Sequence, residues 1–325
     1  MRIVIPDDFP PVFAPSPHLR RLETLGEVIC YTTRAASPAE LLDRLAGAAA
    51  VINVRAFTRF DAELLARLPD LRLISISGTG TDNVDLAAAT ARGVVVCNTP
   101  DANSDSVAEY TWALLLRLCR RVAEMEQRLR AGEWWHHYGV ELAGKTLGVV
   151  GLGRIGQRVA RIGRGFGMRV IAWSLTSDEA RARQLGVESL PLDRLLAEAD
   201  VLSLHLRASE RTVGLIGREA LARMKPTALL VNTARGALVD EVALAEALAA
   251  GRIAGAALDV YTTEPLPAEH PLRQVPNCIL SPHAGWMTDE ARERMIAQPI
   301  DHVLAFFRGE PRGVVNPDAL ARNRS

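Results

Sequence analysis

The sequence predicts an α/β protein with two doubly wound parallel sheets, and three observations support this fold class. The 325 residues are more than one hydrophobic core usually serves, and they suit two domains. Hydrophobic residues make up 48% of the chain and charged residues 23%, which is an ordinary globular composition. Short apolar runs alternate with amphipathic stretches almost from end to end, as they do in parallel sheets covered by helices.

The first third of the chain contains five apolar runs that read as strands, with amphipathic stretches between them. The expected strands are residues 2–5, 28–31, 49–54, 71–76 and 94–97. The expected helices are residues 18–25, 38–46, 61–67 and 85–91. A broad apolar face then predicts one long helix over residues 104–130, which Gly132 ends.

A second alternation begins after this helix. Its expected strands are residues 146–150, 169–173, 201–205, 228–232, 256–260 and 278–281. A helix over residues 288–308 follows the last of them, and a short polar tail ends the chain. Six strands with intervening helices are what a dinucleotide-binding domain requires.

A glycine-rich turn joins the first of these six strands to a helix predicted from Arg154 to about residue 165. It reads Gly151-Leu152-Gly153-Arg154-Ile155-Gly156, a GxGxxG pattern. In such a turn the first glycine allows a tight bend, the second lets the backbone approach a pyrophosphate, and the third lets helix and strand pack closely. Because the helix also presents free N–H groups there, we expect a dinucleotide phosphate site. The alternative is a tight turn that binds no ligand.

Ser174 directly follows the expected second strand of this domain, where an NAD-binding domain usually has an acid for the ribose hydroxyls. Serine can bind a hydroxyl or a phosphate and does not repel the phosphate of NADP. Neither the acid typical of NAD nor an adjacent arginine typical of NADP is present. The sequence therefore predicts that the protein binds NAD or NADP. We expect it to use both, with a preference for NADP.

Three polar residues follow three consecutive strands at the edge of the sheet where ligands bind. They are Arg235 after the fourth strand, Glu264 after the fifth and His283 after the sixth. Arginine suits a carboxylate, histidine exchanges protons near neutral pH, and a glutamate beside a histidine favours its protonated form. Each alone has a plain structural explanation, but their order downstream of a dinucleotide loop predicts a catalytic site.

These motifs carry a resemblance to the D-2-hydroxyacid dehydrogenase family, which includes phosphoglycerate dehydrogenase and glyoxylate/hydroxypyruvate reductase. It extends from Arg55 to Pro317. Besides the glycine turn, it rests on the segments that contain residues 78–85, 107–109, 231–241, 255–265 and 281–283. The resemblance implies a flavodoxin-like substrate domain of residues 1–101 and 289–325. Inserted in it would be a Rossmann NAD(P)-binding domain of residues 102–288, through which the family forms homodimers.

The resemblance also implies a role for individual residues. Arg235 would bind the substrate carboxylate and carbonyl oxygen, His283 would be the acid/base, and Glu264 would pair with His283. Further substrate contacts are expected from Arg55, Gly78, Thr79, Gly80 and Trp286. Cofactor contacts are expected from Gly151, Gly153, Arg154, Ile155, Gly156, Ser174, His205, Arg207, Thr233, Asp259 (at the nicotinamide carboxamide) and His283.

The chain departs from the family pattern at several positions. Arg207 replaces a proline near the adenine, and it could hold the phosphate of NADP together with Arg181 or Arg183. The alternative is that all three arginines are solvated surface charges. Ile76 stands where several phosphoglycerate enzymes have an arginine, so unphosphorylated keto acids are expected to be the better substrates. Trp286 adds a large aromatic side chain just after His283, which leaves open a preference for a bulkier keto acid.

Composition excludes several other classes of protein. Lys and Arg total 38 and Asp and Glu total 38, so the balanced charge argues against a nucleic-acid partner. No apolar run is long enough to span a membrane, and the four cysteines show no metal-ligand spacing. We therefore expect a cytoplasmic enzyme without a metal site that acts on a small 2-keto or 2-hydroxy acid. The alternative is a dinucleotide-binding co-regulator of the same fold without significant turnover.

Overall fold

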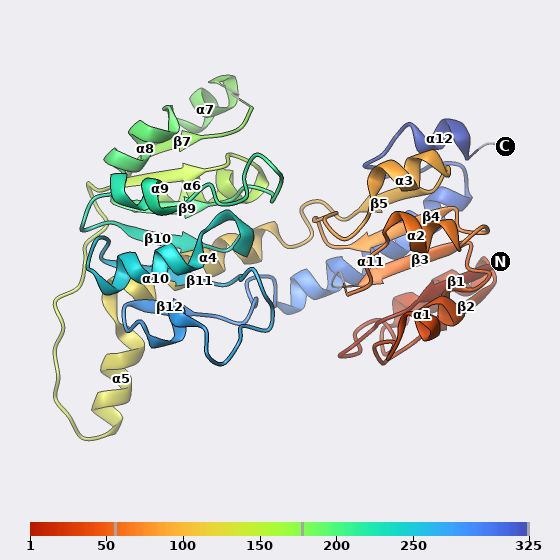
Figure 1. Cartoon of the computed structure of the whole chain (residues 1–325), viewed down its shortest axis with the longest axis horizontal. Coiled ribbons are helices and arrows are strands. Elements are labelled where there is room, and N and C mark those ends of the chain that lie inside the picture. The colour runs from red at the N-terminus through yellow and green to blue at the C-terminus, as the bar shows by residue number, and fades with distance from the viewer. Residues whose placement is uncertain (55–56, 177–178, 324–325) are drawn as a thin grey trace. The chain divides into compact units, whose positions relative to one another are not determined.

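The computed structural model describes residues 1–54, 57–176 and 179–323. The chain divides into two compact units, each of which is described by itself (Figure 1). The first unit combines Met1–Asn103 with Thr288–Ser325, and the second is Ser104–Met287. Each unit is built on one parallel sheet.

The first unit contains a five-stranded sheet in the order β2-β1-β3-β4-β5. Its strands are β1 (Arg2–Ile5), β2 (Glu27–Cys30), β3 (Ala50–Val54), β4 (Leu73–Ser77) and β5 (Val95–Asn98). This 2-1-3-4-5 order is that of a flavodoxin-like fold. All five strands lie within a residue or two of their expected positions, because each is a short apolar run between turn residues.

Helices cover both faces of this sheet (Figure 1). One face holds α1 (Pro38–Leu45), α2 (Ala62–Ala66) and α3 (Leu86–Ala91), and the other holds η1 (Pro17–Thr24) and α11 (Asp289–Phe307). Successive side chains of β1 alternate between the two cores, as a strand requires: Ile3 and Ile5 face α11, whereas Val4 faces α1. The segment expected as a helix at residues 18–25 is a 3₁₀-helix. A short α12 (Ala319–Arg322) ends the unit.

The second unit contains a seven-stranded sheet in the order β12-β11-β10-β9-β6-β7-β8. Its strands are β6 (Thr146–Val150), β7 (Arg169–Trp173), β8 (Glu188–Ser189), β9 (Val201–Leu204), β10 (Leu229–Asn232), β11 (Gly255–Leu258) and β12 (Cys278–Leu280). The strand order reverses between β6 and β9, which is the Rossmann arrangement extended by one strand. The six expected strands are present. The edge strand β8 was not expected, because its two residues carry no apolar run.

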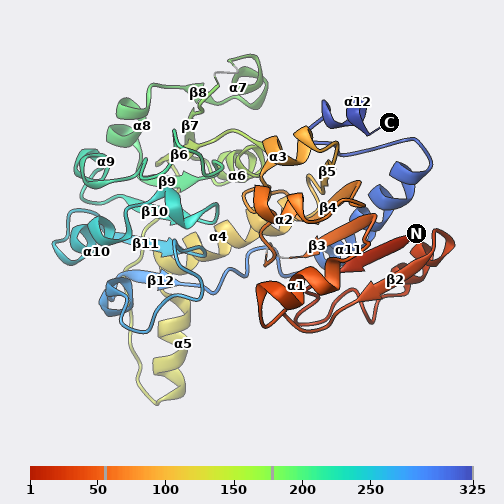
Figure 2. The same ribbon diagram turned by 45° about the vertical axis from the view of Figure 1, so that its right-hand side comes forward.

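Helices also cover both faces of the second sheet (Figure 2). One face is packed by α4 (Ser104–Arg120) and α6 (Arg154–Gly165). The other is packed by α8 (Leu192–Glu198), α9 (Arg218–Arg223) and α10 (Glu241–Ala249). The remaining helical segments are α5 (Val122–Arg130), α7 (Glu179–Leu185), η2 (Gly236–Leu238) and η3 (Pro271–Gln274).

The prediction of one continuous helix over residues 104–130 is wrong. The helix breaks between α4 and α5 at Arg121, whose φ of 47° is left-handed. The Cys119 carbonyl accepts a hydrogen bond from the Val140 amide at 2.9 Å, so the returning chain engages it in place of the next helical turn. The segment 122–140 therefore leaves the body of the unit, and both views show α5 projecting from it (Figures 1 and 2).

Candidate active site

The register of the paired strands places the expected site residues of the second unit at one edge of its sheet. Val150, the last residue of β6, pairs with Trp173 of β7 and Leu204 of β9, so the residues that follow these strands begin side by side. They are Gly151, Ser174 and His205. In the same way Asn232 pairs with Leu258, and Leu258 with Leu280, so Thr233, Asp259 and Ser281 follow at the same edge.

The glycine turn after β6 has the geometry of a phosphate loop. Gly151 has φ +103°, and a Cβ built on it would lie 2.7 Å from the His205 carbonyl oxygen. A Cβ on Gly156 would lie 2.0 Å from the Gly151 carbonyl oxygen. Both positions therefore require glycine. At Gly153 nothing lies within 4 Å of the built Cβ, so the side of the turn that a ligand would approach is open.

The start of α6 lies next to this open side. Gly153 is its N-cap and supplies no side-chain acceptor for the first amides of a twelve-residue helix. Uncapped N–H groups and the positive end of a helix suit an anionic phosphate. Arg154 is exposed there, and Ile155 is half-buried against the core between α4 and α6. These residues fit a dinucleotide pyrophosphate.

Ser174 is bound to the glycine turn. Its hydroxyl oxygen accepts a hydrogen bond from the Leu152 amide at 2.9 Å, and its own hydrogen can still be donated to a ligand. Arg207, three residues after β9, is exposed, and its carbonyl oxygen accepts a hydrogen bond from Thr212. His205 bonds Ser203 Oγ through Nε2 at 2.8 Å, and burial lowers the pKa of this imidazole to about 3. His205 is therefore neutral at physiological pH.

His283 and Glu264 form a hydrogen-bonded pair between two adjacent strand ends. His283 Nδ1 lies 2.8 Å from Glu264 Oε2, and both side chains are partly exposed, at 44% and 37%. His283 has φ +55°, a left-handed conformation that is rare for residues other than glycine and is concentrated at functional sites. Because Nδ1 is engaged, Nε2 is the ring nitrogen available for proton exchange.

Arg235 belongs to the same group of side chains. Burial alone raises the pKa of Glu264, but hydrogen bonds from His283 and the Tyr261 amide, with the charges of His283 and Arg235, outweigh it and lower the pKa below its usual 4.5. Glu264 is therefore ionised at neutral pH. A Cβ on Gly236 would lie 2.0 Å from the Tyr261 carbonyl carbon, so the turn that carries Arg235 packs directly on the loop that carries Glu264.

The main chain around Arg235 and Glu264 is fixed by buried polar side chains. Asn232 is buried, accepts from the Ala234 amide at 3.0 Å and donates to the Arg235 carbonyl at 2.9 Å. Glu241 accepts from the amide of Thr262 at 2.7 Å and lies 3.0 Å from His270 Nε2. Both loops are thus held independently of a ligand.

Thr233 and Asp259 are buried at the strand ends and contact other parts of the second unit. The Thr233 hydroxyl lies 2.8 Å from that of Thr111 in α4. The Asp259 carboxylate accepts hydrogen bonds from the Ser281 hydroxyl and from the two amides that follow His283. Trp286, half-buried, comes directly after these amides.

Three of the residues expected to bind substrate, Gly78, Thr79 and Gly80, follow β4 in the first unit. Gly78 has φ +151°, and its amide donates to Thr99 Oγ1 at 2.8 Å. The Thr79 carbonyl accepts from Asn98 Nδ2 at 2.7 Å, and Gly80 is half-buried next to it. Ile76 is buried in the core of this unit. Arg55 lies outside the described residues.

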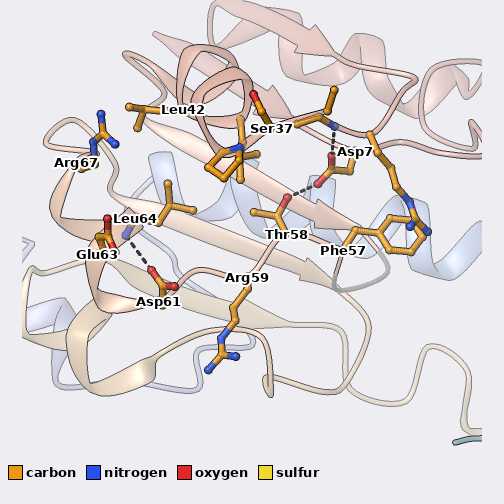
Figure 3. Close-up of a pocket in the computed structure, with 15 residues that line it drawn as sticks. Asp7, Ser37, Leu42, Phe57, Thr58, Arg59, Asp61, Glu63, Leu64 and Arg67 are labelled. Atoms are coloured by element: carbon orange, nitrogen blue, oxygen red, sulfur yellow. Dashed lines mark hydrogen bonds between the residues drawn. The ribbon is translucent and has the colours of Figure 1, made fainter. Parts of the chain in front are cut away.

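A cavity of about 630 Å³ lies in the first unit, at the ends of β1 and β3 (Figure 3). Asp7 is buried at its floor and accepts a hydrogen bond from Thr58. Arg59 and Arg67 also line the cavity, but their side chains extend away from Asp7 (Figure 3). A binding site usually has a few convergent polar groups, and these groups do not converge. The catalytic candidates of the second unit do not line this cavity.

Several residues that organise the site were not predicted from the sequence. They are Tyr110 and Thr111 on α4, Asn232 at the end of β10, Glu241 on α10, His270 before η3 and Ser281 after β12. Asn232 acts on residues two and three positions after it, whereas each of the others acts through a contact that is distant in sequence and that no local spacing could reveal. Among the described residues no group of His, Cys, Asp or Glu is arranged to hold a metal ion, and no helix is long and apolar enough to cross a membrane.

Comparison with known proteins identifies the family. The family model for the D-isomer specific 2-hydroxyacid dehydrogenase, NAD binding domain, matches residues 112–285. A glyoxylate reductase of Aeropyrum pernix is 45% identical over 272 residues, 81% of each chain. A D-3-phosphoglycerate dehydrogenase of Mycobacterium leprae is 48% identical over 259 residues, 79% of this chain and 49% of that protein.

A solved structure has the same fold. An acyclic imino acid reductase, Bsp5, in complex with NADPH and D-Arg matches with a TM-score of 0.88 and 27% identity, over 97% of this chain and 100% of that one. The predicted fold class and the predicted family are confirmed. The chain belongs to the D-isomer specific 2-hydroxyacid dehydrogenase family and is an oxidoreductase acting on the CH–OH group of 2-hydroxy acids.

Proposed function

We propose that this enzyme interconverts a small, unphosphorylated 2-keto acid and its D-2-hydroxy acid, with His283 as the acid/base. The observation that carries the proposal is the 2.8 Å bond between His283 Nδ1 and Glu264 Oε2, on a loop next to the one that carries Arg235. A histidine oriented by an ionised carboxylate, with a fixed cation nearby, is the set of groups that keto-acid reduction needs.

The chemistry divides between the cofactor and the protein. A bound nicotinamide dinucleotide supplies the hydride in reduction and accepts it in oxidation. Arg235 holds the substrate carboxylate and polarises the carbonyl oxygen. His283 donates the proton on Nε2 to that oxygen in reduction and removes the hydroxyl proton in oxidation, while ionised Glu264 stabilises the protonated ring. We include Arg55, Gly78, Thr79 and Gly80 among the groups that bind the carboxylate.

The substrate part of the proposal rests on side-chain size and charge. Ile76 is buried and apolar, so it cannot replace the arginine that several phosphoglycerate enzymes have at this position. Glyoxylate or hydroxypyruvate should therefore be used better than 3-phosphohydroxypyruvate. Trp286 would favour a bulkier or aromatic keto acid if its ring borders the substrate. The relatives named glyoxylate reductase support the first choice.

For the cofactor we propose use of both NADH and NADPH with a preference for NADPH. Ser174 has no charge to repel a 2′-phosphate, and the exposed Arg207 can supply a cation for it. Arg183 donates to a carbonyl of its own helix, from Nε to Glu179 at 3.3 Å, and Arg181 lies in the same helix. The NADPH in the imino acid reductase structure supports this choice, and the family description names NAD.

We also propose a homodimer formed through the cofactor-binding unit, with the segment 122–140 as its interface. The nine residues of α5 contain no buried residue, and such a short helix is marginal in water without a partner surface. Leu129, Trp134 and Tyr138 are exposed apolar groups on this segment. Arg128 stacks on Trp135 at 4.3 Å, so the end of α5 contacts the loop that follows it. We expect a second copy of this chain to pack against the segment, and we expect the dimer to be cytoplasmic.

A substrate panel tests the proposed function most broadly. The purified protein is assayed for loss of reduced-nicotinamide absorbance with glyoxylate, hydroxypyruvate, 3-phosphohydroxypyruvate, pyruvate and phenylpyruvate, each with NADH and NADPH. We expect turnover with at least one unphosphorylated acid and a lower kcat/KM for the phosphorylated one. A higher kcat/KM for 3-phosphohydroxypyruvate would refute the substrate assignment. Tight cofactor binding without turnover of any keto acid would favour the co-regulator alternative.

A further inference from the structure

We propose that Tyr110 is a positioning residue for His283, and that it acts through a hydrogen-bond chain from α4 through Ser281 to Asp259. The inference rests on the proposed function, because it takes His283 as the acid/base. It gives a catalytic consequence to the contact between Tyr110 of α4 and Ser281, which lie 171 positions apart in the sequence.

The first two bonds of the chain have a defined direction. The Ser281 hydroxyl donates to Asp259 Oδ1 at 2.6 Å. The Tyr110 and Ser281 hydroxyl oxygens lie 2.7 Å apart. A serine hydroxyl has one hydrogen, which is committed to Asp259, so Tyr110 must be the donor to Ser281. Tyr110 thereby fixes the rotamer in which Ser281 reaches the carboxylate.

At the other end of this series of hydrogen bonds, Asp259 holds the backbone on the C-terminal side of His283. Asp259 Oδ1 accepts from the Ala284 amide at 2.8 Å, and Oδ2 accepts from the Gly285 amide at 2.8 Å. His283 precedes these two residues with φ +55°. A residue other than glycine keeps a left-handed conformation only where its surroundings hold it there. Asp259 thus fixes the backbone of His283, whereas Glu264 orients its ring.

Burial increases the effect of losing any hydrogen bond between Tyr110, Ser281 and Asp259. Asp259 and Ser281 are both almost fully buried, where a missing partner is not replaced by water. A Cβ on Gly285 would lie 3.0 Å from Asp259 Oδ2 and 3.5 Å from Tyr110 Cδ1, so the segment after His283 packs against both residues. The Ser281 main chain is separately held by Tyr261, whose hydroxyl donates to the Ser281 carbonyl at 3.0 Å. Loss of the Tyr110 hydroxyl should therefore weaken the hydrogen bonds from Ser281 to Asp259 without unfolding the loop after β12.

The test uses Tyr110→Phe, which keeps the ring and removes only the donor. We expect kcat for the keto acid to fall about three- to tenfold, the size of effect that one hydrogen bond has. KM for the keto acid and Tm should stay close to wild type, because the Tyr110 hydroxyl bonds Ser281, whose main chain is held separately by Tyr261. Tyr31→Phe is the matched control: it removes a tyrosine hydroxyl in the first unit and should leave kcat unchanged.

A double-mutant cycle with Ser281→Ala decides whether Tyr110 acts through Ser281. Ser281→Ala should lower kcat at least as much as Tyr110→Phe, and the double variant should be no slower than Ser281→Ala alone. Effects that multiply, or a fall in Tm that accounts for the lost activity, would overturn the inference. So would wild-type kcat in Tyr110→Phe. If wild type itself reduces no keto acid, the proposed function fails instead, so the two failures are distinguishable.

Discussion

The hydroxyl oxygen of Ser174 accepts a hydrogen bond from the main-chain amide of Leu152, at 2.9 Å. The residue at the usual position of the ribose-binding acid therefore also holds the phosphate loop in shape. An aspartate here would keep an acceptor for Leu152 and add a negative charge that repels a 2′-phosphate. Ser174→Asp should raise the Kd for NADPH by about tenfold or more and change the Kd for NADH little.

The two cofactors are titrated separately in this experiment, and binding is followed by fluorescence or calorimetry. Ser174→Ala is the control, since it removes the acceptor for Leu152 without adding charge and should weaken both cofactors alike. Equal losses for NADH and NADPH in Ser174→Asp would mean that position 174 shapes the loop and does not select the cofactor.

Arg207 is expected to bind the 2′-phosphate of NADPH. Charge-assisted hydrogen bonds make a difference of about ten- to a hundredfold in affinity, so Arg207→Ala should weaken NADPH by that factor and spare NADH. Arg211→Ala, which removes another exposed arginine four residues further along, is the matched control. Unchanged NADPH affinity in Arg207→Ala, or a strong NADH preference in wild type, would contradict the cofactor proposal.

The segment 122–140 is expected to carry the dimer interface. Leu129→Asp places a charge on an exposed apolar position of α5, so it should convert the dimer to a monomer in light scattering after size-exclusion chromatography. Val213→Asp, at an equally exposed valine elsewhere in the second unit, should leave the dimer intact. A monomeric wild type, or a dimer that survives Leu129→Asp, would count against this interface.

Ionised Glu264 should make the stability of the enzyme depend on pH at the acidic end. Its pKa in the folded protein lies below 4.5 because the bonds from His283 and Tyr261 and the nearby positive charges outweigh burial. The contribution of Glu264 to the free energy of unfolding is therefore fully present above the pKa that this residue has in the unfolded chain. It is lost as the pH falls through the lower pKa of the folded protein. The Tm difference between wild type and Glu264→Gln should be present above about pH 5 and shrink towards zero below it. A difference that persists in acid would show that charge is not its origin.

Pro299 inside α11 leaves one helix carbonyl without its usual donor, and Ser77 of β4 bonds that carbonyl. Pro299 has no N–H for the Met295 carbonyl, and the buried Ser77 hydroxyl donates to that carbonyl at 2.7 Å instead. Ser77→Ala should lower the free energy of unfolding by about 1 to 3 kcal/mol, because a buried carbonyl loses its partner. In a Pro299→Ala background the helix supplies its own N–H, so the same substitution should cost less. An equal cost in both backgrounds, measured by urea unfolding, would refute this account.

Much of the fold could be predicted because strands of parallel sheets are short apolar runs and their order follows from connection rules. The strands β1 to β5 and the sequence from β6 to β12 follow this pattern, and only β8 lacks the apolar run that would predict it. The break at Arg121 could not be predicted, because its partner is the amide of Val140, which returns from a later loop.

The site shows the same division between local and distant signals. Gly151, Gly156, Arg235 and His283 could be found because strand ends and glycine spacing are local patterns. The left-handed backbone of His283 and the hydrogen bonds that Asp259 accepts from the two amides after it could not, since Asp259 precedes those amides by 25 and 26 positions. These contacts determine how precisely the predicted residues are held.

Replacement of His283 tests the central claim most directly. Glutamine keeps a polar side chain of similar reach but cannot donate a proton as an acid. The account predicts that His283→Gln lowers kcat for the best keto acid by about 10²- to 10⁴-fold, the usual contribution of general acid–base catalysis, with cofactor Kd and Tm near wild type. Turnover close to wild type in this variant would remove His283 from the mechanism and contradict the account.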